Sequence, residues 1–219
     1  MTEEEQLEAI KKWWHKYSNL ITIISSIILL AFAGYKYWNW HQDKVKTQAS
    51  MAYENLMVAF SNQDNPVSMA YINQIIKQYR KTVYADAARL VLAKLYVSED
   101  SLDKAKEQLE YITSHSSMPA LKQVARIRLA RILISEKNYD KALHELSYLD
   151  DAGYRPVINE LKGDVFAANG QYQQALQSYK EAIAEVRTNG MGNLFLEMKT
   201  NELASLSQLL NDNQKLQSA

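Results

Sequence analysis

Three stretches of this 219-residue chain repeat one another, and this repetition constrains the fold more than any other feature. Each stretch has a small residue, an alanine twelve positions later, and a large apolar residue four positions after that alanine. The alanines of successive stretches are 37 and 33 residues apart. Small residues let two helices approach closely, and larger apolar residues fill the space beside them, so the pattern predicts stacked helix pairs. The three sets are Ala93, Ala105 and Leu109; Ala130, Ala142 and Leu146; and Gly163, Ala175 and Tyr179.

This spacing is typical of the tetratricopeptide repeat, which has a period of about 34 residues. Short polar stretches (SEDSLD, SEKNYD and ANGQYQ) join the two helices expected in each pair. The chain has only six glycines and three prolines, fewer turn residues than sheets and long loops generally need. We therefore expect an all-α chain whose main part is a tetratricopeptide-repeat α-solenoid.

A second feature is a run of 19 residues without a charge, from Tyr17 to Tyr35. A helix of this length spans about 28 Å, close to the roughly 30 Å hydrocarbon core of a bilayer. Aromatic side chains flank the run, and amphipathic rings favour the level of the lipid headgroups. The run therefore predicts a single N-terminal transmembrane helix at residues 17–38. The membrane-interface aromatics are Trp13, Trp14, Tyr35, Tyr37, Trp38 and Trp40.

The same run is also compatible with a cleaved secretory signal. Ala31-Phe32-Ala33 before Gly34 resembles a small-x-small processing site. Four acidic residues precede the run, however, where the leading region of a signal is net positive, and this favours the anchor. Three lysines lie close to the run on each side, Lys11, Lys12 and Lys16 before it and Lys36, Lys44 and Lys46 after it, so the charge pattern does not indicate which side of the membrane holds the body.

These features divide the chain into six segments. The stack of helix pairs needs a final helix to cover its last apolar face. We expect a short N-terminal tail at 1–16, the transmembrane helix at 17–38, a linker with a degenerate first helical pair at 39–84, three repeats at 85–192, a capping helix at 193–210 and a frayed tail at 211–219.

The sequence contains no recognisable catalytic or cofactor motif. It has no cysteine, its four histidines are scattered, and it lacks a glycine-rich phosphate loop and a nucleophile elbow. The 25 Lys and Arg balance the 25 Asp and Glu, and a neutral chain lacks the excess positive charge of a nucleic-acid surface. We therefore expect a protein that is not an enzyme, with no catalytic residues, no cofactor, no metal and no nucleic-acid partner.

In such a solenoid the first helix of each repeat lines a concave face. Side chains there either contact the neighbouring helix or water, or form a mixed apolar and charged groove for a peptide or a partner helix. The candidate partner-binding residues are Leu90, Lys94, Val97, Ile127, Arg131, Ile134, Glu160 and Asp164.

The order of segments, the motif Tyr37-Trp38-Asn39-Trp40-His41-Gln42 and the stretch AYENLMVAF before the repeats together resemble the YfgM family. The resemblance implies an ancillary subunit of the bacterial SecYEG translocon. It implies a single-pass protein of the inner membrane, with its N-terminal tail in the cytoplasm and its C-terminal domain in the periplasm. The implied partners are the SecYEG channel, a membrane-anchored PpiD-like chaperone and emerging secretory proteins. Two other interpretations stay open: a cleaved, soluble periplasmic scaffold for envelope assembly, and a docking protein that faces the cytoplasm.

Overall fold

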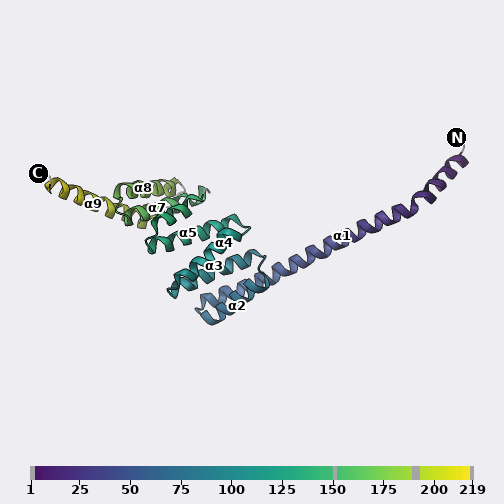
Figure 1. The fold of residues 1–219 in the computed structure, drawn as a ribbon, viewed down its shortest axis with the longest axis horizontal. Helices are drawn as coiled ribbons and strands as arrows, with labels where there is room; N and C mark the ends of the chain where they lie inside the picture. Colours follow the sequence, from purple (N-terminus) through teal and green to yellow (C-terminus); the bar gives the residue numbers. More distant parts are fainter. Residues whose placement is uncertain (1–2, 150–151, 189–192, 218–219) are drawn as a thin grey trace. The chain divides into compact units, whose positions relative to one another are not determined.

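The computed structural model describes residues 3–149, 152–188 and 193–217, and all regular structure in these ranges is helical (Figure 1). The chain divides into two compact units, Met1–Ala52 and Tyr53–Ala219. This confirms the all-α fold class.

Helix α1, Glu3–Ser61, makes up the described part of the first unit and continues to the start of the second. No single helix in the described ranges has the length and hydropathy expected of a membrane span. The two arms of α1, Gln6–Leu20 and Thr22–Ser61, meet those requirements only when taken together, and they are bent by 42° relative to each other. The transmembrane helix at residues 17–38 therefore stays a prediction.

The second unit is a stack of antiparallel helix pairs. Each helix packs against the next along the chain, and α5 also packs against α3 and α7, the first helices of the neighbouring pairs (Figure 1). Contacts limited to neighbouring pairs are what a solenoid requires. The helices are α2 (Asn65–Gln78), α3 (Val83–Ser98), α4 (Leu102–His115), α5 (Pro119–Ser135), α6 (Tyr139–Ser147), the 3-10 turn η1 (Ala152–Tyr154), α7 (Arg155–Ala168), α8 (Tyr172–Thr188) and α9 (Leu194–Gln217).

The turns inside the pairs share one geometry. Gln63, Asp100, Lys137 and Gly170 have φ values of 58°, 57°, 61° and 76° and are separated by 37, 37 and 33 residues. The residue after each donates its backbone N–H to a carbonyl five residues earlier, at 2.8 to 3.0 Å. This is the Schellman motif, which ends a helix with one residue in the left-handed conformation. Because the same turn ends α1, the end of α1 and helix α2 form a pair with the spacing of the three repeats.

The alanines that define the repeats lie in the core. Ala105, Ala142 and Ala175 are fully buried where the two helices of each pair meet. This confirms the packing role that the repeat pattern predicts for small residues. In the first pair the equivalent position holds Ser68, which is also fully buried.

Helix α9 packs against α8 and covers the end of the stack. Leu196, Thr200, Leu203 and Ser207 form its buried stripe, with the spacing of one helix face. The helix continues to Gln217, past residue 210 where we expected it to end. Gln, Lys and Leu in this segment are good helix formers, which accounts for the difference.

Candidate partner-binding groove

The candidate groove lies on the face formed by α3, α5 and α7, which we call the first-helix face. Lys94, Arg131 and Asp164 occupy equivalent positions on these three helices, one repeat apart. The repeat pattern predicts that all three side chains lie on one surface. The structure places their side chains in two different environments.

Between α3 and α5 lies a cavity of about 340 Å³, which we call the α3–α5 cavity. It includes three of the predicted groove residues, Lys94, Val97 and Arg131. Its volume is at the lower end of the range of about 300–1,000 Å³ that is typical of ligand sites. The residues that line it are Ala93, Lys94, Val97, Leu109, Arg128, Arg131 and Ile132.

Three other predicted groove residues contribute mainly to the core. Leu90 and Ile127 are each only 7% exposed and belong to the clusters that hold neighbouring pairs together. Ile134 is partly buried and packs against both clusters. These three apolar side chains therefore contact neighbouring helices, which was the alternative to their lining a groove.

The last two predicted residues, Glu160 and Asp164 on α7, are paired with Lys199 of α9. The Nζ atom of Lys199 lies 3.1 Å from Oε1 of Glu160 and 2.9 Å from Oδ1 of Asp164. Burial lowers the pKa of Lys199, but hydrogen bonds and charges from Asp164 and Glu160 outweigh it, so the pKa is raised overall. The phenol of Tyr179 also donates a hydrogen bond to Asp164, at 2.7 Å. At this end of the first-helix face, the carboxylates already have partners within the chain.

Arg128 was missed by the sequence analysis. Its Nη1 donates a hydrogen bond to the carbonyl oxygen of Leu90, at 2.9 Å, which links α5 to α3. Burial and the nearby charge of Arg131 lower the pKa of Arg128. The available signal was spacing, because residues three apart share a helix face and Arg128 lies three before Arg131. The equivalent residue in the preceding repeat is the buried Val91, which pointed to the core instead.

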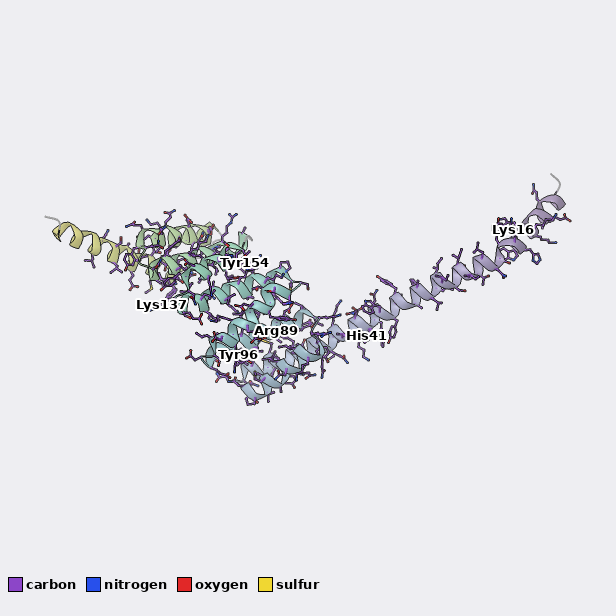
Figure 2. The ribbon with its side chains drawn as sticks, viewed as in Figure 1. Lys16, His41, Arg89, Tyr96, Lys137 and Tyr154 are labelled. Atoms are coloured by element: carbon purple, nitrogen blue, oxygen red, sulfur yellow. The ribbon has the colours of Figure 1, made fainter. Side chains whose placement is uncertain are left out.

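Two other arginines on the first helices, Arg89 and Arg126, are bound within their own pairs. Arg89, labelled in Figure 2, lies 3.8 Å from the ring centroid of Tyr111 and donates a hydrogen bond to Gln108. One repeat later, Arg126 lies 4.2 Å from the ring centroid of Tyr148 and forms an ion pair with Glu145. These repeated contacts join the two helices of a pair. Neither Arg89 nor Arg126 lines the α3–α5 cavity, whose cations are Lys94, Arg128 and Arg131.

On α1, the six predicted membrane-interface aromatics are all exposed. Figure 2 labels Lys16 and His41 on either side of the uncharged run. Tyr37 stacks its ring on that of His41, with centroids 6.4 Å apart. These six residues are Trp13, Trp14, Tyr35, Tyr37, Trp38 and Trp40. In the described parts of the chain, no cluster of three or more His, Asp or Glu side chains has the geometry of a metal site.

Comparison with known proteins agrees with this architecture. The family model described as "Tetratricopeptide repeat-like domain" matches residues 11–205. A protein of Aggregatibacter actinomycetemcomitans named "Ancillary SecYEG translocon subunit" is 30% identical over 181 residues, which are 82% of this chain and 88% of the relative. Relatives of the same name from Escherichia coli K12 and Neisseria gonorrhoeae are 28% and 26% identical, covering 92% and 93% of this chain and 97% and 98% of their own. These relatives form a scaffold family rather than an enzyme family. The chain therefore belongs to the YfgM family of tetratricopeptide repeat-like proteins.

Proposed function

We propose that this chain is an ancillary subunit of the SecYEG translocon that works by binding other proteins. The observation that carries the proposal is that relatives aligned over more than nine-tenths of the chain have this name. The first-helix face supplies a surface suited to such a role, because the α3–α5 cavity combines apolar and charged side chains. The proposed partners are the channel, emerging secretory proteins and a PpiD-like membrane-anchored chaperone.

In this proposal, residues 17–38 anchor the chain in the inner membrane, and the second unit lies in the periplasm. Support comes from the uncharged run and from its exposed apolar side chains, such as Ile27, Ile28 and Leu30. Exposed apolar surface of this kind is stabilised by lipid. Anchoring near the channel raises the effective concentration of partners, so that weak contacts are sufficient.

Site-specific photo-crosslinking in native membranes tests the proposed function. A photo-reactive residue at Val97, in the cavity, is compared with one at Val67, on α2. The two valines are similarly exposed, at 44% and 41%, so they form a matched pair. We expect crosslinks from Val97 to the translocon, a secretory chain or the chaperone, and fewer from Val67. Equal crosslinking from both positions, or none from Val97, would contradict binding at this face.

The orientation is tested separately with single cysteines, since the natural chain has none. Glu8→Cys and Glu107→Cys place a thiol at an exposed position before and after the uncharged run. In cells with a permeabilised outer membrane, an impermeant maleimide is expected to label position 107 and spare position 8. The reverse pattern would place the body in the cytoplasm.

A further inference from the structure

The α3–α5 cavity is lined by three cations that have no carboxylate partner among the described residues. Lys94, Arg128 and Arg131 line it, and no ion pair found in the described ranges includes any of them. Lys94 has a different contact, with its Nζ 5.0 Å from the ring centroid of Phe60. A ring attracts a cation but does not neutralise it. The positive charge of the cavity is therefore uncompensated.

Several other cations of the second unit show how such a charge can be compensated within the chain. Three partly buried cations of this unit have carboxylate partners within 3 Å, which is how such charges are usually stabilised, whereas Arg89 is held by Tyr111 and Gln108. The pairs are Lys106 with Glu136 at 2.7 Å, Arg126 with Glu145 at 2.7 Å and Lys199 with Asp164 at 2.9 Å.

The geometry favours a carboxylate as the missing partner. Arg128 is half-buried and is held in place by its bond to the Leu90 carbonyl, so its guanidinium is already oriented. Arg131 lies close enough to lower the pKa of Arg128, and an anion between them would relieve that repulsion. Guanidinium groups match the planar, two-oxygen geometry of carboxylates particularly well.

The apolar residues that line the rest of the cavity indicate which kind of molecule would bind there. Ala93, Val97, Leu109 and Ile132 make the cavity apolar around the cations. A nucleic acid is a poor fit for this cavity, because it needs a longer positive surface and the chain as a whole has no net formal charge at pH 7. An apolar wall beside a small cationic cluster fits a protein segment with an acidic residue next to large apolar side chains.

We propose that the α3–α5 cavity binds an acidic and apolar segment of a partner protein, with one Asp or Glu carboxylate held between Arg128, Arg131 and Lys94. This inference rests on the proposed function as a protein-binding subunit and adds the chemistry that its binding site recognises. Lys94 and Arg131 provide the selectivity, because both are exposed and neither forms an ion pair with a described residue. Arg128 positions the site through its contact with α3.

The test uses the full-length chain, purified in mild detergent, and three fluorescent 13-residue peptides. The peptides share a framework of Leu, Ala and Ser and differ only at the central residue, which is Glu, Gln or Lys. Fluorescence anisotropy measures the three dissociation constants. We expect the Glu peptide to bind at least tenfold more tightly than the Gln peptide, and the Lys peptide to bind least.

Charge reversal provides the decisive variant. Lys94→Glu with Arg131→Glu is expected to invert the preference, so that the Lys peptide binds best. The matched control is Lys77→Glu with Lys141→Glu, two exposed lysines on α2 and α6 outside the cavity, and it should keep the preference for Glu. If the reversed variant does not fold, as judged by circular dichroism, Lys94→Gln with Arg131→Gln should equalise the Glu and Gln peptides.

The proposal is overturned if the peptides bind equally, if none binds, or if the control variant loses the preference as well. These results are distinguishable from failure of the proposed function. Crosslinking from Val97 reports on the cellular partner whatever its charge, whereas the peptide series reports only on carboxylate selectivity.

Discussion

Gly163 on α7 and Tyr179 on α8 lie so close together that no methyl group fits between them. A Cβ atom added at Gly163 would overlap the ring of Tyr179. In the preceding repeat the equivalent residues are Ala130 and Leu146. The third repeat thus has a smaller residue on one helix and a larger one on the other, which maintains the filled volume.

This relationship predicts that Gly163→Ala destabilises the protein. The ring cannot easily move, because its phenol donates a hydrogen bond to Asp164 at 2.7 Å. Overpacking costs about 1–3 kcal/mol, and the better helix propensity of Ala returns up to about 1 kcal/mol, so we expect a net loss of about 1 kcal/mol. Urea unfolding measures the change. Adding Tyr179→Leu, which restores the combination found at Ala130 and Leu146, should recover part of the loss; an unchanged unfolding midpoint for Gly163→Ala would contradict the packing described here.

At Ser68, in contrast, we expect a substitution by Ala to stabilise the protein. It is fully buried on α2, and its hydroxyl has no hydrogen-bond partner. A buried, unsatisfied hydroxyl costs about 1–3 kcal/mol, so Ser68→Ala should raise the free energy of unfolding by about 1 kcal/mol. The converse substitution, Ala105→Ser at the equivalent position of the next pair, should lower it. A destabilised Ser68→Ala would indicate that the hydroxyl has a partner after all.

The cluster on α7, α8 and α9 predicts a loss of stability at alkaline pH. Burial, the hydrogen bond to Asp164 and the nearby carboxylates raise the pKa of Tyr179 above its ordinary value of 10.0. The pKa of Lys199 is also raised above 10.5, because its carboxylate partners outweigh the effect of burial. In both cases the folded state retains a proton that the unfolded state releases, so stability is unchanged below about pH 10 and falls above it.

The measurement is the free energy of unfolding in urea at about pH 8 and about pH 11. Other tyrosines and lysines also titrate in this range, so the informative quantity is the difference between the natural chain and a variant. Tyr179→Phe and Lys199→Gln should each reduce the loss of stability between the two pH values. An identical loss in both variants would show that the cluster is not responsible.

Much of the fold follows from local sequence patterns. The spacing of small and large residues predicts the helix pairs, because Ala105, Ala142 and Ala175 have to lie where two helices cross. The groove was harder to predict. Asp164 occupies the same repeat position as Lys94 and Arg131, but Lys199, 35 residues later, pairs with it. A contact of that range depends on how the last helix packs, and no local pattern specifies it.

The first pair illustrates a second limit. Its small-residue pattern is weak, because Leu56 stands where the later repeats have Ala93 or Ala130. The turn at Gln63 nevertheless has the same backbone geometry as the turns at Asp100 and Lys137. Non-glycine residues carry the left-handed conformation at these three turns, and the sequence lacks the glycine that usually marks it.

The last prediction concerns the uncharged run of α1. If residues 17–38 lie in a bilayer, a charge near their centre has to be buried in hydrocarbon, at roughly 2.5–3.5 kcal/mol for each arginine. Ile24→Arg with Ile28→Arg should therefore weaken membrane attachment by roughly 5–7 kcal/mol. Arginine is a good helix former, so the effect cannot come from unfolding of the helix itself.

Extraction of membranes with alkaline carbonate measures the attachment. The natural chain should stay in the pellet, and the double variant should move to the supernatant. The control is Met51→Arg with Val58→Arg, which replaces two apolar residues that are also exposed on α1 but lie beyond the run. This control should stay in the pellet, because its arginines would lie in water. A natural chain in the supernatant, with a mature N-terminus at Gly34 by mass spectrometry, would instead identify the run as a cleaved signal.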